Sequence, residues 1–251
     1  MHFNVIASGS KGNATLVIYK KSVILIDMGI TLTRLEEGLE ESHLTINDIT
    51  GAIFTHDHTD HIGGIKFISP KIRYALDKTL PGSLSHVVKV NEPFNIGDFT
   101  IIPFKTSHDA KNPCGFKLIA GEETMVYMTD TGVFLDENLP LIKDPTYLII
   151  ESNHDIKMLL HTHRTFELKS RIMSEVGHLC NEDSAIAASQ IIGPHTKEIV
   201  LAHLSEEANT PELALEAYKK VFRHFHINFD NYRLVCAHQW HSTFGGHDDE
   251  N

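Results

Sequence analysis

The sequence has 251 residues, of which 41% are hydrophobic and 22% are charged, a composition that fits one large globular domain and excludes overall disorder. No apolar run is long enough to cross a bilayer, and the first ten residues lack the pattern of a secretory signal, so we expect a cytoplasmic protein with no membrane partner. The three cysteines form no CxxC pair, which excludes a disulfide framework and a cysteine-rich zinc finger.

The charge balance is acidic, with 22 Lys and Arg against 33 Asp and Glu and a formal net charge of −11. Binding to a phosphate polymer depends on positive charge, so this balance disfavours a module that passively coats DNA or RNA. The sequence also holds 18 histidines, an unusual number for a domain of this size. Clustering of these histidines would indicate a metal site.

The predicted elements form a meander of strands, then a helix, then a short buried strand that leads into a histidine-rich segment. Turns rich in Gly, Ser and Asn separate the first strands, and Leu35 and Leu39 give the helix an i, i+4 apolar face. The predicted strands of this part are 2–7, 14–19, 22–27 and 52–55, and the predicted helix is 33–41.

The rest of the chain alternates strands with longer helices. Asn181 is the predicted N-cap of a helix that ends near Ile192, and Thr210 caps a helix with Pro211 at its first position that ends near Phe225. The predicted strands are 99–104, 115–119, 124–128, 147–150, 198–202 and 232–236. Two similar halves of strands flanked by helices predict an α/β domain over residues 1–244, followed by a polar, disordered tail over 245–251.

Residues 56–61, His-Asp-His-Thr-Asp-His, carry the clearest chemical signal in the sequence. Side chains alternate along an extended backbone, so His56 and His58 point to the same side, and Asp60 and His61 join them if a helix begins after His58. Three imidazoles and a carboxylate suit zinc, manganese or iron. An ordinary polar loop needs neither a strand leading into it nor this density of histidine.

The HxHxDH pattern after a short strand resembles the metallo-β-lactamase superfamily, and the other positions of that pattern follow in order. They are Asp27 in SVILIDMG, His108 in KTSHDA, Asp130 in YMTDTG and His203 in IVLAHLS. The segments SGSKGNAT, ESNHD and VGHLCNEDSA are similar to the YycJ/WalJ branch of bacterial metallohydrolases. The resemblance covers essentially the whole chain, and it implies an αββα sandwich with a dinuclear metal site at one edge.

The resemblance also implies which residues bind two divalent metal ions. The implied ligands are His56, His58 and His108 for the first ion, Asp60, His61 and His203 for the second, and Asp130 between the two. This set leaves open positions for a water molecule and for substrate oxygens, as a catalytic site requires. Asp60 is expected to orient the attacking water as well, and Asp27 to hold a ligand imidazole from outside the ligand set.

Further candidates lie outside the ligand set. His178 precedes the predicted helix at 181, whose N-terminus favours a phosphate, and His154 follows the strand near 150. The related ribonuclease Z pattern also has a histidine before this helix, so we hypothesise that His178 binds or protonates the scissile phosphate and that His154 lines the site. Ser10 and Asn13 are candidate substrate contacts, with a tight strand connection as an equally supported alternative.

Two other polar groups have simpler interpretations. His161 and His163 copy the His-x-His spacing but lack the following Asp-His, so we expect a surface loop there. Arg164, Lys169 and Arg171 form a small basic group that suits a nucleic-acid backbone, although a solvated helix face explains it somewhat better.

The leading functional interpretation is a metal-dependent phosphodiesterase, because the YycJ/WalJ branch includes nucleases that degrade duplex DNA from 5′ to 3′ and have a proposed link to DNA repair. The alternative is a hydrolase of a small phosphodiester, thioester or lactone at the same metal site, which the acidic surface favours. Rising salt should weaken binding of a polymer and leave a small ester unaffected. Diiron oxidoreductases of this fold carry Glu at the position of His58, which argues against a redox role.

Overall fold

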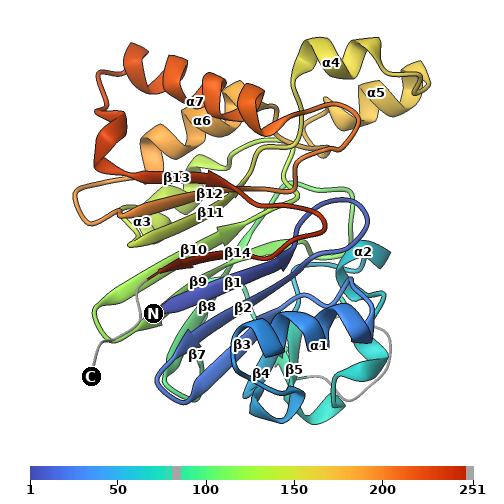
Figure 1. The fold of residues 1–251 in the computed structure, drawn as a ribbon, viewed down its shortest axis with the longest axis vertical. Helices are drawn as coiled ribbons and strands as arrows, with labels where there is room; N and C mark the ends of the chain where they lie inside the picture. Colours follow the sequence, from blue (N-terminus) through green and yellow to red (C-terminus); the bar gives the residue numbers. More distant parts are fainter. Residues whose placement is uncertain (78, 81–85, 247–251) are drawn as a thin grey trace.

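The structure is a computed structural model that describes residues 1–77, 79–80 and 86–246. Two seven-stranded sheets within these residues face each other, and helices cover the outer face of each sheet (Figure 1). The predicted αββα sandwich is therefore confirmed.

The first sheet joins an antiparallel meander to a set of parallel strands, in the order β14-β1-β2-β3-β4-β5-β6. Its strands are β1 (His2–Ala7), β2 (Ala14–Tyr19), β3 (Ser22–Ile26), β4 (Gly51–Ile53), β5 (Arg73–Leu76), β6 (His86–Val88) and β14 (Thr243–Gly246). Strands β3 and β4 run parallel, and Ile26 lies opposite Ile53 in their register. Because both strands end together, the residues that follow them meet at one edge of the sheet.

The second sheet has the order β13-β12-β11-β10-β9-β8-β7 and is parallel from β10 to β13. Its strands are β7 (Phe94–Ile96), β8 (Phe99–Lys105), β9 (Cys114–Ala120), β10 (Glu123–Met128), β11 (Tyr147–Glu151), β12 (Glu198–Ala202) and β13 (Arg233–Cys236). Met128 lies opposite Ile150, and Glu151 lies opposite Ala202. The carboxyl ends of β10, β11 and β12 are thus side by side.

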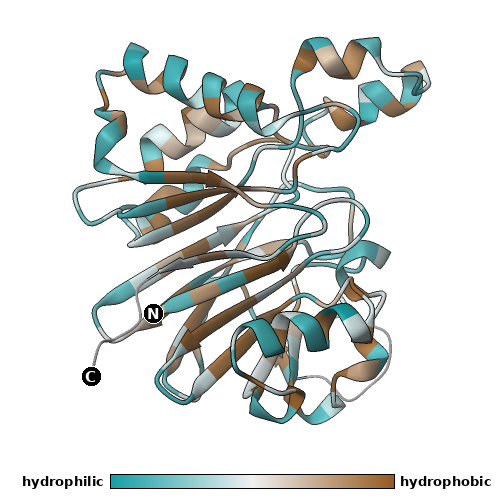
Figure 2. Cartoon of the chain, in the orientation of Figure 1, coloured by the Kyte–Doolittle hydropathy of each residue, from teal (hydrophilic) through white to brown (hydrophobic). Residues whose placement is uncertain are grey.

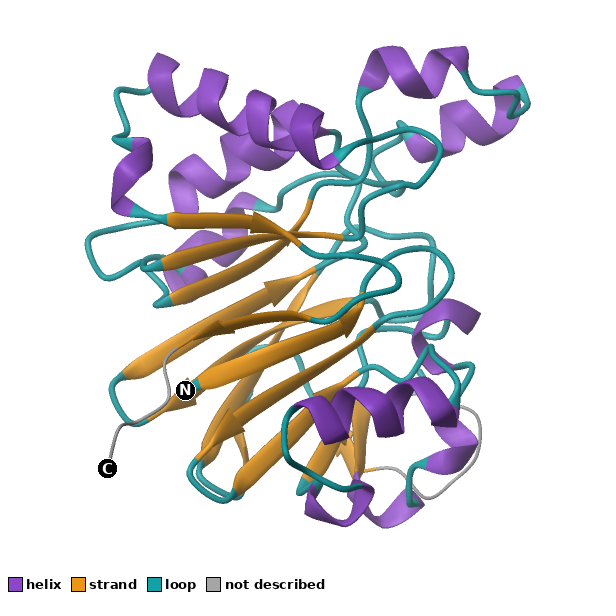
Figure 3. Cartoon of the chain, in the orientation of Figure 1, coloured by secondary structure: helices purple, strands orange, loops and turns teal. Residues whose placement is uncertain are grey.

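Helices occupy the two outer layers, as Figure 3 shows in purple. The α-helices are α1 (Leu32–Glu41), α2 (Thr59–Ile62), α3 (Leu139–Ile142), α4 (Ile156–His161), α5 (Phe166–Ile172), α6 (Asn181–Ile191) and α7 (Pro211–His224). Single 3-10 turns are Ile46–Asp48, Ile65–Phe67, Pro70–Ile72, Asp136–Asn138 and Phe229–Asn231. No helix among the described residues is both long enough and apolar enough to cross a membrane.

The helix starts follow the expected capping chemistry, with one correction. Thr210 caps α7, as predicted, and its hydroxyl accepts from the backbone N–H of Leu213. The predicted cap of α6 is wrong by one residue: Cys180 is the N-cap, and its sulfur accepts from Asp183 N. The side chain of Asn181 is buried instead, where its Oδ1 accepts from Ser152 Oγ at 2.7 Å.

The main core lies between the sheets, where buried hydrophobic residues from strands of both sheets form one cluster, and Figure 2 shows these strands rich in hydrophobic residues. Phe3 of the first sheet packs edge-on against Tyr147 of the second, with ring centroids 5.6 Å apart. A second core lies beneath α6 and α7, where Tyr218 and Phe222 pack on the outer face of the second sheet. Each large buried side chain contributes about 2 kcal/mol of transfer free energy, so both layers hold the strand ends rigidly.

Four short strands were not predicted, because each has only three or four residues and no clear alternation of apolar and polar side chains. They are β5, β6, β7 and β14. The first two residues of the predicted tail, Gly245 and Gly246, belong to β14, which pairs with β1 and puts Gly245 opposite Phe3. Polar composition hid this pairing, since backbone hydrogen bonds form it. Residues 247–251 of the predicted tail lie outside the described residues.

A tight backbone junction joins the first sheet to α2. Asn13 N donates to Asp60 O at 2.8 Å, and Gly29 N donates to Asn13 O at 2.9 Å. A Cβ on Gly29 would lie 1.6 Å from Asp60 O. Only glycine therefore allows the loop after β3 to pass beneath the histidine-rich segment.

We predict that Gly29→Ala lowers the free energy of unfolding by about 3 kcal/mol, because fixed backbone has to move to admit the methyl group. Denaturant unfolding measures this change. Gly51→Ala is the control, because its Cβ would meet side-chain atoms rather than backbone, with Ile96 Cγ2 at 2.7 Å and Tyr74 Cε2 at 3.5 Å. Equal destabilisation by both variants would contradict the account of this junction.

Candidate metal centre

All seven predicted ligands lie at the edge where the strands of both sheets end. They occupy the loop after β4 (His56, His58), helix α2 (Asp60, His61), and the loops after β8 (His108), β10 (Asp130) and β12 (His203). Potential ligand atoms of these residues lie within 4.8 Å of one another in groups of three, and a further group of four joins Asp130 and His203 to Glu151 and His178. Separate motifs along the chain thus form one cluster.

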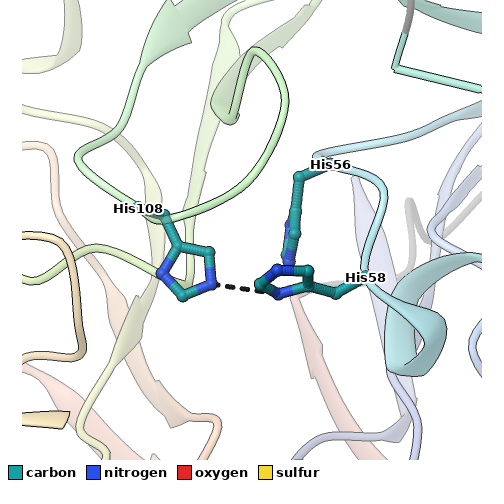
Figure 4. A group of neighbouring side chains, drawn as sticks. All are labelled: His56, His58 and His108. Carbon is teal, nitrogen blue, oxygen red and sulfur yellow. Dashed lines mark hydrogen bonds between the residues drawn. The ribbon is translucent and has the colours of Figure 1, made fainter. Parts of the chain in front are cut away.

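The first group consists of His56, His58 and His108, which point toward one another (Figure 4). His108 Nε2 lies 3.2 Å from His58 Nδ1, while His108 Nδ1 donates to Gly177 O at 3.0 Å. Burial and the neighbouring His61 lower the pKa of His56 far below its usual range, so its imidazole is neutral. Neutral imidazole is the form that binds a metal ion.

The second group consists of Asp60, His61 and His203. Asp60 Oδ2 lies 3.5 Å from His61 Nε2 and 3.7 Å from His203 Nε2. Burial alone would lower the pKa of His61, yet the carboxylates of Asp130 and Asp27 raise it to about 10. An environment that holds a proton so firmly is strongly negative, and the same field stabilises a bound cation.

Asp130 lies between the two groups. Its Oδ2 is 3.2 Å from His61 Nε2, and its Oδ1 is 3.8 Å from His108 Nε2 and 3.6 Å from His203 Nδ1. Burial would raise the pKa of this carboxyl group, but His203 and His61 hold it well below its usual range. Its backbone is left-handed, with φ of 55°, which turns the side chain back toward the histidines.

Three buried polar atoms at the centre have no hydrogen-bond partner among the described residues: His56 Nε2, His203 Nε2 and Asp130 Oδ2. Buried nitrogen and oxygen atoms are almost always paired, and leaving one unpaired costs about 1–3 kcal/mol. All three belong to ligand-type groups. The donor set therefore fits divalent metal ions, with nitrogen and oxygen ligands.

Two carboxylates outside the proposed ligand set, those of Asp27 and Glu151, contact the imidazoles and fix their orientation. Asp27 Oδ2 lies 2.8 Å from His61 Nδ1, and the same carboxylate accepts from Thr55 N and Thr55 Oγ1, both at 2.8 Å. Because Nδ1 is engaged, the Nε2 atom of His61 faces the centre.

Glu151 has the corresponding role in the second sheet, although it was not among the predicted site residues. Its Oε1 lies 2.9 Å from His203 Nδ1 and 2.8 Å from His178 Nδ1, while its Oε2 accepts from Thr131 N at 3.0 Å. The side chain is fully buried. The available signal was its position: like Asp27, it is a carboxylate directly after an apolar β-run.

His178 lies beside the cluster, with its ring centroid 5.1 Å from that of His108 and 5.2 Å from that of His203. Glu151 engages its Nδ1, and its side chain remains 15% exposed. The Nε2 atom is therefore the one available to a substrate.

His154 is placed differently from the expectation that it lines the site. It is fully buried, forms an isolated β-bridge with Cys180, and belongs to none of the groups of potential metal ligands among the described residues. Burial lowers the pKa of its imidazole to about 4. At neutral pH it is uncharged and has no imidazolium proton to donate.

The two candidate substrate contacts, Ser10 and Asn13, lie in different environments. Ser10 lines a surface cavity beside Asp60. The amide of Asn13 is buried, accepts from Gly9 N at 2.8 Å, and lies 3.3 Å from Asp60 O. Asn13 thus holds the loop on which Asp60 depends.

The remaining polar groups form contacts within the chain. Arg171 donates to Asp109 Oδ1 at 2.9 Å, Lys169 Nζ donates to Thr162 O at 2.8 Å, and Arg164 Nε donates to Glu207 at 3.0 Å. These bonds favour the helix-face interpretation of the basic group. His161 lies at the end of α4 and bonds to Lys157 O.

Comparison with known proteins gives consistent matches. A family model described as Beta-lactamase superfamily domain matches residues 23–204. The chain is 35% identical over 234 residues to exodeoxyribonuclease YycJ of Bacillus anthracis, across 88% of this chain and 89% of the relative. It is 33% identical over 227 residues to exodeoxyribonuclease WalJ of Streptococcus pneumoniae D39, across 84% of each chain.

Solved structures match over almost the full length. The metallo-β-lactamase fold protein YhfI from Bacillus subtilis has a TM-score of 0.72 at 18% identity, across 97% of this chain and 98% of that one. Human tRNase Z, short form, has a TM-score of 0.63 at 15% identity, across 97% and 98%. At these identities the likeness shows the fold.

We predict that Asp130→Ala weakens binding of divalent metal by at least about tenfold, because it removes the carboxylate between the two histidine groups. Metal content after dialysis against a competing chelator, measured by elemental analysis, checks this. Asp136→Ala, which removes an exposed carboxylate, is the control. Metal retention by Asp130→Ala equal to that of the control would show that the cluster does not bind the metal.

Proposed function

The chain belongs to the β-lactamase superfamily, and on that premise we propose that it is a metal-dependent nuclease that removes nucleotides from the 5′ ends of duplex DNA. One observation carries the proposal: a buried His/Asp cluster with unpaired ligand atoms lies beside His178, whose Nε2 makes no hydrogen bond to the described residues. The similarity to the exodeoxyribonucleases YycJ and WalJ supports DNA as the substrate.

The proposed cofactors are two divalent cations. We assign His56, His58 and His108 to one cation, Asp60, His61 and His203 to the other, and Asp130 to both. When bound, such cations supply Lewis-acid stabilisation of the phosphoryl oxygens and activate water. Histidine and carboxylate ligands suit zinc, manganese and iron.

Asp60 and His178 are the proposed catalytic residues of the chain. The side chain of Asp60 is 23% exposed, so its carboxylate reaches both the buried histidines and an incoming water, which it orients by accepting a hydrogen bond. His178 Nε2 donates a proton to the departing 3′ oxygen of the cleaved phosphodiester. Glu151 holds His178 Nδ1 and so fixes the direction of Nε2.

The buried neutral His154 is not assigned a proton-transfer role. Its ring nitrogen Nδ1 lies 3.3 Å from Asn153 Oδ1, and Asn153 Nδ2 in turn donates to His203 O at 2.9 Å. We propose that His154 supports the backbone on which Glu151 and His203 are mounted.

We predict that the protein shortens an end-labelled DNA duplex when Mn²⁺ or Zn²⁺ is supplied, with the 5′ label released first, and that His56→Ala abolishes the shortening. Gel electrophoresis over a time course measures both products. The alternative substrate classes predict the opposite result: no shortening with metal verifiably bound would reject the nuclease function and leave the metal centre in place.

We also predict that His178→Ala lowers kcat on DNA by about 10²–10⁴-fold, the range for a lost general acid, with little change in bound metal. Single-turnover cleavage and elemental analysis measure the two quantities. His195→Ala is the control, because that histidine is 81% exposed and pairs with Asp144 away from the cluster. An unchanged kcat would remove His178 from the reaction.

A further inference from the structure

A surface cavity of about 710 Å³ lies directly beside Asp60, and the metal cluster does not account for it. Four separate segments line it: the turn around Lys11, the loop that leads into α1, helix α2 with the turn at Lys66 and Phe67, and the C-terminal segment with Trp240. Any strand that delivers a phosphate to Asp60 has this cavity available for its neighbouring nucleotides.

Two exposed aromatic rings line the cavity. Trp240 is 57% exposed and Phe67 is 37% exposed. The indole N–H of Trp240 donates to Glu206 Oε1 at 2.7 Å, which fixes the ring in place. Rings of this size at the surface offer a ligand the aromatic area that the neighbouring side chains leave exposed.

Each ring is accompanied by a lysine. Lys11 Nζ lies 5.2 Å from the centroid of Trp240, and Lys66 Nζ lies 5.0 Å from the centroid of Phe67. Glu206 pairs with Lys11 at 2.8 Å and offsets its charge, whereas Lys66 has no ion pair within the described part of the chain. Proteins that bind single-stranded nucleic acid combine cations with aromatic rings. The cation binds the phosphate, and the ring stacks with the base.

The charge of the cavity opposes that of the chain as a whole. Lys11, Arg34 and Lys66 line it with the carboxylate of Asp60, although the net charge of the chain is −11. Arg34 Nη2 donates to Ile6 O at 2.9 Å, which fixes this cation in place, and Arg34 Nη1 lies 3.4 Å from Glu37 and 3.8 Å from Glu41, which offset its charge. Lys66 is therefore the cation of this cavity that no carboxylate offsets among the described residues, and it is the one to which a phosphate can bind.

We propose that this cavity binds unpaired nucleotides of the DNA strand being cut, with bases stacked on Trp240 and Phe67 and a phosphate beside Lys66. The inference rests on the proposed nuclease function, because the cavity begins at Asp60. It specifies the substrate further: bases in a duplex are stacked on each other, so only a strand separated at its end presents free faces to these rings.

Trp240 is the only tryptophan in the sequence, so its fluorescence reports directly on this cavity. The experiment titrates the intact, metal-loaded protein with a phosphorothioate thymidine oligonucleotide of about ten nucleotides, a length that spans a typical single-strand site. The expected result is saturable quenching of the tryptophan emission, with a Kd that rises with salt.

The variants Phe67→Ala and Lys66→Gln are each expected to raise this Kd, by about tenfold for the lost stacking surface. Phe67→Leu keeps an apolar side chain but removes the aromatic face, so it should weaken binding as well. Phe225→Ala and Lys220→Gln are the matched controls, because both positions are exposed and lie on or beside α7, in the outer layer of the second sheet. Both controls are expected to leave Kd unchanged.

Absence of quenching, or equal Kd values for Phe67→Ala and Phe225→Ala, would overturn the inference. These results are distinguishable from failure of the proposed function. If the unmodified protein shortens duplex DNA but shows no quenching, the nuclease function stands and the cavity is not the strand site. If it shortens no duplex, the proposed function fails on that assay, and oligonucleotide quenching still tests the cavity separately.

Discussion

The structure depends on one electrostatic constraint: a buried group of histidines and carboxylates in which three central atoms make no hydrogen bond within the described chain. His56 Nε2, His203 Nε2 and Asp130 Oδ2 cannot remain unpaired in the interior without a cost of about 1–3 kcal/mol each. Divalent cations remove that cost and neutralise the negative field that raises the pKa of His61. The chain fixes the outward Nδ1 atoms of His61 and His203 and leaves the inward Nε2 atoms of His56 and His203 without a hydrogen bond among the described residues.

Each sheet supplies one carboxylate at a strand end that fixes the Nδ1 atom of a histidine in the cluster. Asp27 follows β3 and holds His61 Nδ1, while Glu151 ends β11 and holds His203 Nδ1. Asp27, Asp130 and His203 have φ of 60°, 55° and 55°, a left-handed conformation that costs energy for side chains other than glycine. The apolar cores anchor the strands, so the fold can maintain this strain at the site. The stability of the two sheets therefore determines how precisely the side chains of the candidate metal centre are positioned.

Much of this was predictable because the chemistry lies in short motifs next to strong β-patterns. Residues 56–61 and the three single positions Asp27, Asp130 and His203 follow apolar strands, and strand register brings them together. Glu151 was not predicted as a site residue because a carboxylate at the end of a strand is common in sequences. Its partners His178 and His203 lie 27 and 52 residues further along the chain. The burial of His154 and the Trp240 cavity depend on tertiary packing, which no local pattern encodes. The choice of Cys180 over Asn181 as a cap follows from Asn181 having buried partners.

The central claim is that this edge of the sandwich holds two cations that share Asp130. Anomalous diffraction from crystals of the Mn²⁺-loaded protein tests it most directly. The account predicts two peaks about 4 Å apart, one among His56, His58 and His108 and the other beside His61 and His203, with Asp130 between them. A single peak, or peaks away from these residues, would contradict it.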